Sequence, residues 1–189
     1  MPEQLLREAD MNTLTAPTVA PYGENRGGLP PAAAVAAQAA SKHLIFSLGK
    51  EEFAVPVSKV KEIIGMLEVT PVPHTPDHVR GVINLRGKVV PVIDLRAKLG
   101  VPTAEYDERT CIIVVQPEMA KSVYLIGVIV DGVSEVMPVQ SAEIEKTETF
   151  SHGLISANYV QGVAKIRGKV KILLDLDCVI SQADLRQLV

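Results

Sequence analysis

A stretch of 17 residues occurs twice in this chain, and this repeat limits the possible folds more than any other feature. The first copy, Val79–Leu95, reads VRGVINLRGKVVPVIDL, and the second, Val160–Leu176, reads VQGVAKIRGKVKILLDL. The copies lie 81 positions apart and are identical at nine of 17 positions. An internal repeat of this kind indicates one supersecondary unit that is used twice.

Each copy has the pattern of two strands joined by a tight turn. In the first copy, the sequence predicts a strand over Gly81–Leu85, a turn at Arg86-Gly87 and an apolar strand over Val89–Ile93. Asp94 then stands where it can cap a short helix, Leu95–Leu99. Asp175 has the same place in the second copy, so we expect a hairpin followed by a capped helix twice.

A weaker repeat precedes the first one. The segment VSKVKEI from Val57 resembles VDGVSEV from Val130 at an offset of 73 positions. We interpret both segments as the end of a strand, a small polar cap and a short helix, with Ser58 capping a helix over Lys59–Ile64 that Gly65 closes. The whole module is therefore doubled.

The remaining elements are short. The sequence predicts further strands at Leu44–Leu48, Glu52–Val57, Cys111–Val115 and Val123–Val130, loops at Thr70–Pro76 and 137–158, and a final helix from Asp175 to about Leu188. Residues 1–40 are rich in Ala and Pro and predict a disordered tail. Residues 41–189 predict one domain, with half-modules of about 43–109 and 110–189. Short aliphatic strands and tight turns favour an all-β fold of two small barrels with a few short helices.

Composition and motifs argue against several functions. The net charge is −3 without a basic patch, so nucleic acid is not an expected partner. The sequence shows no secretory signal and no apolar run that would span a bilayer, which favours a reducing, cytoplasmic setting without membrane insertion. Cys111 and Cys178 sit in apolar stretches and predict buried free thiols.

The sequence also lacks the residue patterns of a reaction centre. There is no Gly-rich phosphate loop between a strand and a helix and no nucleophile elbow. His74 and His78 are separated by Pro76, so we interpret them as loop residues and not as metal ligands. We therefore expect neither an enzyme nor a cofactor.

From His43 to the C-terminus the chain resembles the chemotaxis coupling protein CheW family. The resemblance rests on FAVPVSKVKEII, VRGVINLRGKVVPVIDLRAKLG, IGVIVDGVSEV and YVQGVAKIRGKVKILLDL. The regulatory domain of the kinase CheA is similar, but no phosphotransfer, dimerisation, ATP-binding or receiver segment is present, so we expect a free-standing adaptor. The resemblance implies two pseudo-symmetric five-stranded SH3-like barrels. It also implies a non-catalytic role that links methyl-accepting chemoreceptors to CheA.

The resemblance further implies a surface for the cytoplasmic tip of the receptor. The residues that it marks are Val57, Val60, Glu62, Ile63, Arg80, Asn84 and Arg86. Arg86 would pair with Glu62 or with a polar group of the receptor, whereas the alternative is an exposed turn residue. The apolar members could instead be core, Arg80 could be solvated, and Asn84 could bond the backbone of its turn.

A second surface is implied for the kinase regulatory domain, at Val89, Val90, Val92 and Met137. Gly81, Gly87 and Gly168 are expected to be structural turn glycines, because they allow backbone conformations that a side chain would obstruct. Two other functions remain open. One is an adaptor of a related pathway that controls pilus motility or cyclic-di-GMP, and the other is a small-ligand sensor that uses the groove between the barrels.

Overall fold

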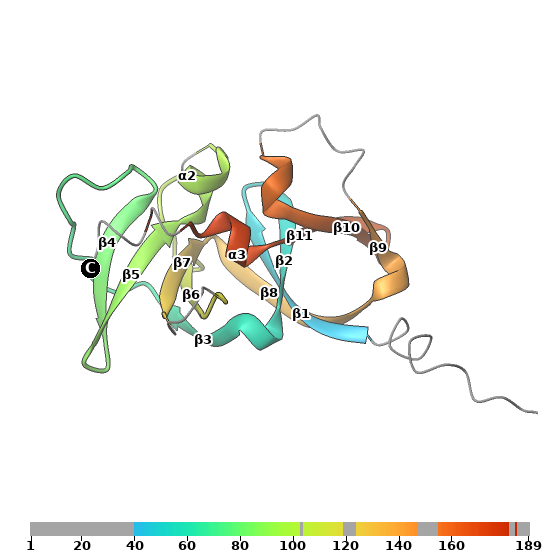
Figure 1. Ribbon diagram of the computed structural model, residues 1–189, viewed down its shortest axis with the longest axis horizontal. Coiled ribbons are helices and arrows are strands. Elements are labelled where there is room, and N and C mark those ends of the chain that lie inside the picture. Colours follow the sequence, from blue (N-terminus) through green and yellow to red (C-terminus); the bar gives the residue numbers. More distant parts are fainter. Residues whose placement is uncertain (1–39, 103, 119–123, 147–154, 182–183, 185–189) are drawn as a thin grey trace, which may run out of the picture. The chain divides into compact units, whose positions relative to one another are not determined.

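The computed structural model describes residues 40–102, 104–118, 124–146, 155–181 and 184. All but the last residue of the predicted tail, 1–40, lies outside this part. The described chain is mostly β-strand with a few short helical segments, as predicted (Figure 1).

The strands form two sheets. The six-stranded sheet has the order β8 (Gly132–Gln140), β1 (Ala40–Leu48), β2 (Glu51–Pro56), β11 (Lys169–Leu174), β10 (Val160–Ile166), β9 (Ile144–Glu145). The five-stranded sheet has the order β3 (Val60–Gly65), β6 (Cys111–Val115), β7 (Ile126–Val130), β5 (Lys88–Asp94), β4 (Val79–Leu85). Neighbouring strands are antiparallel except β2 with β11 and β5 with β7, which are parallel.

The two sheets share one strand plan, as the sequence repeat predicts. The hairpin β4–β5 corresponds to β10–β11, and β3 corresponds to β8, at the two offsets found in the sequence. The pairing of Thr70 with Val82 recurs as that of Glu145 with Val163 in β9 and β10. Asp94 and Asp175 each accept hydrogen bonds from backbone N–H groups of the helix that follows, which confirms both predicted caps.

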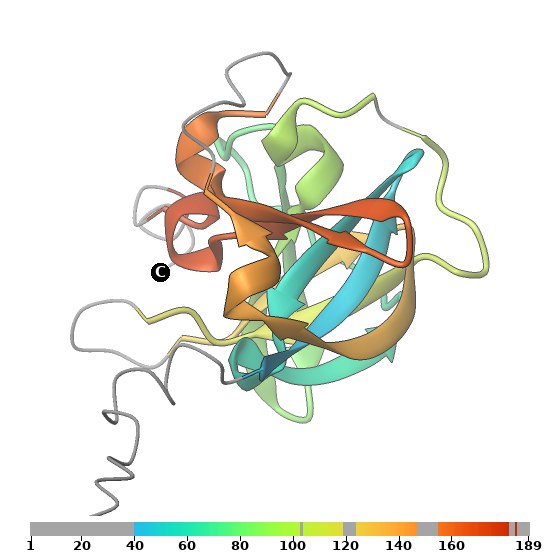
Figure 2. The same cartoon turned by 90° about the vertical axis from the view of Figure 1, so that its right-hand side faces the viewer.

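The division between the sheets does not follow the two halves of the sequence. The six-stranded sheet combines β1 and β2 from the start of the described chain with β8–β11 from its end, and β3–β7 make up the other sheet. In Figure 2 the blue and teal strands β1 and β2 accordingly lie beside the red hairpin β10–β11. The chain crosses between the sheets twice, through η1 (Val57–Lys59) after β2 and directly from β7 to β8.

The two helices predicted from the weaker repeat are wrong. The segment over Lys59–Ile64 is the end of η1 followed by β3, and the equivalent segment after Asp131 is β8. Exposure alternates residue by residue along β3, with Ile63 opposite Ile113 of β6. β-branched side chains suit such a pleated, half-buried position, so strand pairing overrides the helical spacing of the apolar residues.

Other boundaries also differ from the prediction, most of all near the C-terminus and in the predicted loop 137–158. The predicted final helix is interrupted: α3 is Leu176–Val179 and ends because Ile180 has extended backbone angles, Asp184 is again helical, and the other residues of 182–188 lie outside the described part. The predicted loop 137–158 begins with the rest of β8, followed by η2 (Ser141–Glu143) and β9. The helix α2 (Leu95–Leu99) has its predicted bounds and ends at Gly100 with a φ of 73°.

Three apolar clusters hold the described chain together. The largest contains residues from both sheets, among them Phe46 and Phe53, whose rings lie 6.0 Å apart, and Ile113 and Val128. The other two clusters each belong to one sheet. Because the largest cluster joins the sheets, removal of its apolar surface from water stabilises their packing against each other.

Asp184, the last residue that the structure describes, makes ionic contacts beside the five-stranded sheet. The buried carboxylate of Asp184 lies 2.7 Å from Nε2 of His78, which precedes β4, and 2.7 Å from Nζ of Lys98 in α2. Burial alone would raise the pKa of Asp184, but these hydrogen bonds and those from Ser181 hold it at about 2. The charged carboxylate therefore stabilises the folded state.

We expect Asp184→Asn to remove an acid-sensitive part of the stability. Because the folded pKa lies below the unfolded value, the stabilisation is complete above about pH 5 and is lost as the pH falls toward 2. At neutral pH the variant should lose about 2 kcal/mol of unfolding free energy. Urea unfolding at several pH values measures this, and a difference between wild type and variant that stays constant from pH 7 to pH 2.5 would contradict it.

Candidate interaction surface

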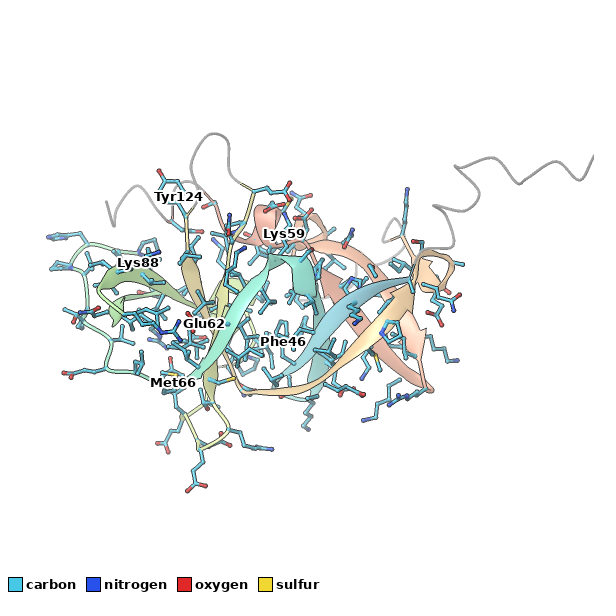
Figure 3. The ribbon with its side chains drawn as sticks, turned by 90° about the horizontal axis from the view of Figure 1, so that it is seen from below. Phe46, Lys59, Glu62, Met66, Lys88 and Tyr124 are labelled. Carbon is cyan, nitrogen blue, oxygen red and sulfur yellow. The ribbon has the colours of Figure 1, made fainter. Side chains whose placement is uncertain are left out.

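An ion pair joins the edge strand β3 of the five-stranded sheet to the tip of the hairpin β4–β5. Nη2 of Arg86, in the turn between β4 and β5, lies 2.7 Å from Oε2 of Glu62 in β3. The sequence suggested that Arg86 pairs with Glu62 or with a polar group of the receptor, and in the structure it pairs with Glu62. The side chain of Arg86 is 78% exposed, so its guanidinium can still donate hydrogen bonds to a partner protein. Figure 3 shows Glu62 on the strand that follows Lys59.

The turn that carries Arg86 has an uncommon backbone conformation. The φ of Arg86 is 52° and that of Gly87 is 83°, which matches the primed turns of two-residue hairpins. Oδ1 of Asn84 accepts a hydrogen bond of 2.8 Å from the backbone N–H of Gly87. Asn84 therefore stabilises this turn and has an exposed position at the hairpin tip.

The same arrangement recurs on the six-stranded sheet. Arg167 has a φ of 51°, and its Nη1 lies 3.2 Å from Oε2 of Glu135 in β8. Gly168 follows with a φ of 78°, as Gly87 follows Arg86. The Arg–Glu pair is therefore a property of the module. If one pair binds a partner and the other does not, the difference comes from the residues that surround each pair.

The predicted apolar receptor residues differ in exposure. Val57 in η1 and Val60 at the start of β3 are partly buried and pack against the largest apolar cluster. Ile63 points to the other side of β3 and is 45% exposed. Val57 and Val60 thus have mixed core and surface character, whereas Ile63 offers most of its side chain to a partner.

Arg80 is held by a polar cluster within the five-stranded sheet. Its guanidinium donates two hydrogen bonds, of 3.2 and 2.8 Å, to Oδ2 of Asp94, which also accepts one of 3.0 Å from the hydroxyl of Tyr106. The hydrogen bond to Asp94 raises the pKa of Arg80 despite partial burial. Since Arg80 is still 41% exposed, it can take part in binding only with its guanidinium already oriented by Asp94.

The four predicted kinase residues do not share one surface. Val89 is 72% exposed, whereas Val90, Val92 and Met137 are at most 4% exposed and belong to the apolar clusters. Side chains along β5 alternate between the two faces of the sheet, so Val90 and Val92 point inward where Val89 points outward. The prediction of a surface role for Val90, Val92 and Met137 is therefore wrong, and Val89 remains.

Two exposed valines were missed by the sequence reasoning. Val136 in β8 is 52% exposed and Val170 in β11 is 57% exposed. They are the repeat equivalents of Ile63 and Val89, at offsets of 73 and 81 positions. The same offsets that revealed the duplication would have identified them, and each sheet thus carries an exposed apolar pair beside its Arg–Glu pair.

The residues that the structure describes do not meet the requirements of a metal site. No group of three His, Cys, Asp or Glu side chains there could hold a metal ion. His78 is bonded to Asp184, and His74 is an exposed residue with a φ of 62°. Both cysteines are free as predicted, but neither is buried as predicted, because Cys111 is partly exposed and Cys178 is exposed. No helix among the described residues has the length and apolar character needed to cross a membrane.

A duplicated β-fold with exposed apolar residues beside ion pairs is the arrangement of a protein-interaction module. Comparison with known sequences identifies the module. The CheW-like domain matches residues 42–184, so the chain belongs to the CheW-like domain family.

Named relatives and a solved structure agree with this assignment. The "Chemotaxis protein CheW" of Klebsiella aerogenes is 37% identical over 142 residues, which cover 75% of this chain and 82% of that protein. That of Rhizobium meliloti is 37% identical over 148 residues, which cover 74% and 92%. The crystal structure of the scaffolding protein TtCheW from Thermoanaerobacter tengcongensis aligns with a TM-score of 0.68 at 31% identity, covering 77% of this chain and 91% of that one.

Proposed function

We propose that this protein is a non-catalytic adaptor of chemotaxis signalling that couples chemoreceptors to the histidine kinase CheA in the cytoplasm. The observation that carries the proposal is the similarity over about three quarters of the chain to proteins named "Chemotaxis protein CheW". The fold supports it, because exposed apolar side chains beside an Arg–Glu pair suit a protein that acts by binding other proteins. The adaptor acts by binding, and no cofactor takes part.

The receptor surface that we propose lies along the edge strand β3 and the tip of the hairpin β4–β5. Ile63 supplies exposed apolar area, and Arg86 supplies a guanidinium oriented by Glu62. Val57 and Val60 border this surface from the crossing η1, and Asn84 flanks it on β4, whereas Arg80 lies near the other end of β4, beside Asp94. A helical hairpin tip with apolar and acidic groups suits such a surface.

The kinase surface that we propose is centred on Val89. This valine is next to the hairpin tip, and its side chain is the most exposed large apolar one among the described residues. Burial of such a side chain against an apolar patch of the kinase regulatory domain contributes about 1 kcal/mol or more to binding.

We expect Val89→Lys to weaken binding of the kinase regulatory domain by about tenfold, because a charge then has to lose its water at the contact. Stability should change by less than about 0.5 kcal/mol, since the side chain is exposed in the free protein. Titration calorimetry measures the affinity. Val170→Lys is the matched control from the equivalent position on the other sheet, and equal weakening by both variants would place the kinase contact elsewhere.

Reconstitution tests the proposed function itself. Receptor cytoplasmic fragments on vesicles are mixed with CheA, with and without this protein, and kinase autophosphorylation is measured. The proposal predicts that kinase activity comes under receptor control only when the protein is present. Kinase activity that is the same with and without the protein would contradict it.

A further inference from the structure

Each of the two crossings between the sheets is tied by an ion pair to a short helix. At the first crossing, in η1, Nζ of Lys59 lies 2.7 Å from Oδ2 of Asp177 in α3. At the second, between β7 and β8, Asp131 accepts two hydrogen bonds from the guanidinium of Arg96 in α2, with the one from Nε 2.5 Å long. All four side chains are at most 35% exposed, so salt and water screen these pairs less than surface pairs.

The two ties are equivalent in the repeat, but their charges are reversed. Arg96 and Asp177 lie 81 positions apart, at the same place in α2 and α3. Asp131 is the equivalent of Ser58, the residue before Lys59, at the offset of 73. The helix thus supplies the cation at one crossing and the anion at the other. The two modules thus share an ion pair between a crossing and a short helix, although different residues form it.

The first tie fixes the crossing from several directions. Oδ1 of Asp177 accepts a hydrogen bond of 2.7 Å from the backbone N–H of Glu118, which follows β6, while Oδ2 accepts from Lys59. Glu118 adds its own carboxylate, 3.2 Å from Nζ of Lys59. Burial by itself would lower the pKa of Lys59, but these hydrogen bonds raise it, so the ammonium stays charged. Asp177 therefore holds together η1, α3 and the end of β6.

The position of this tie links it to the proposed receptor surface. Lys59 stands between Val57 and Val60, which border that surface, whereas Asp177 lies in α3 after the other hairpin. Figure 3 shows Lys59 just before the turquoise strand β3, on which Glu62 lies. A shift of η1 would move both valines relative to the Arg86–Glu62 pair.

We propose that Asp177 is a positioning residue for receptor binding, which acts through Lys59 to hold the η1 crossing in the geometry that the receptor recognises. Asp177 does not itself belong to the receptor surface. This inference rests on the proposed adaptor function and adds to it a determinant outside the contact.

The test compares isosteric substitutions at the two crossings in the full-length protein. Asp177→Asn removes the negative charge of the first ion pair but keeps an oxygen that accepts the N–H of Glu118. Asp131→Asn removes the negative charge of the second ion pair, with Arg96. We expect Asp177→Asn to weaken binding of a receptor cytoplasmic fragment about threefold or more, with the affinity for the kinase regulatory domain unchanged. Both variants should lower the melting temperature by similar amounts, because each loses one ion pair. Asp131→Asn should nevertheless leave receptor affinity unchanged.

A charge swap provides the second variant. Asp177→Lys should weaken receptor binding further through repulsion of Lys59, and the added change Lys59→Asp should restore part of the affinity, because the ion pair returns while the acceptor for the N–H of Glu118 does not. Wild-type receptor affinity in Asp177→Asn, equal weakening by Asp131→Asn, or no rescue by the swap would each overturn the inference. Failure of the wild-type protein to bind any receptor fragment would instead contradict the proposed function. In that case the amide chemical shifts of Val57 and Val60 test whether Asp177 positions η1. Shifts that are the same in the wild type and in Asp177→Asn would overturn the inference.

Discussion

Replacing Gly81 with alanine is expected to cost about 3 kcal/mol or more of unfolding free energy, a large part of the stability of a small domain. A Cβ atom at this position would lie 2.0 Å from the backbone oxygen of Thr70, and the φ of Gly81 is +137°. Thr70 and Val82 exchange two backbone hydrogen bonds of 2.9 Å beside it. The added methyl group therefore has to break this pairing or distort β4.

Gly87→Ala is the matched control for this loss. Gly87 also has a positive φ, of +83°, but a Cβ atom there would meet nothing within 4 Å. Only the backbone strain remains, so we expect a cost of about 1 kcal/mol. Urea unfolding of both variants gives the comparison. Equal losses for Gly81 and Gly87 would show that the close approach of Thr70 is not what requires glycine.

Charge reversal at Arg86 is expected to have the largest effect on function. In Arg86→Glu two carboxylates face each other where the ion pair stood, and the exposed guanidinium is lost to the receptor. We expect receptor control of the kinase to fall at least about tenfold in the reconstituted system. The unfolding free energy should change by less than about 1 kcal/mol, because the pair is at the surface.

Arg167→Glu is the control that tells whether the effect of Arg86→Glu comes from lost receptor binding or from a change in the turn. Arg167 has the same positive φ and the same kind of glutamate partner, on the other sheet. We expect this variant to match Arg86→Glu in stability and to keep receptor control. Loss of control in both variants, or in neither, would contradict a receptor surface at Arg86.

Local chemistry explains which parts of the fold could be predicted. The hairpins, their turns and both aspartate caps follow from residues close together in sequence, so the repeat was enough to place them. The helices predicted from Lys59 and from Asp131 failed because the apolar spacing at Val60, Ile63 and Ile64 fits a helix as well as a half-buried strand. Pairing with β6 decides between them, and that contact is not visible in a short window.

The arrangement of the sheets depends on contacts distant in sequence. β2 pairs with β11, so one sheet combines the two ends of the described chain, which no local pattern records. The surface prediction failed for the same reason at Val90, Val92 and Met137. Apolar strands do not show which face points inward until their neighbours are known. The tie between Lys59 and Asp177 joins residues 118 positions apart and was not predicted from the sequence either.

We propose that one protein binds a receptor and a kinase at the same time through neighbouring parts of the five-stranded sheet, with Ile63 and Arg86 for the receptor and Val89 for the kinase. Analytical ultracentrifugation of this protein with a receptor cytoplasmic fragment and the CheA regulatory domain measures this directly. We predict a ternary complex in which the regulatory domain sediments with the receptor fragment only when the adaptor is present. Displacement of the receptor fragment by the regulatory domain, so that only binary complexes form, would contradict the claim.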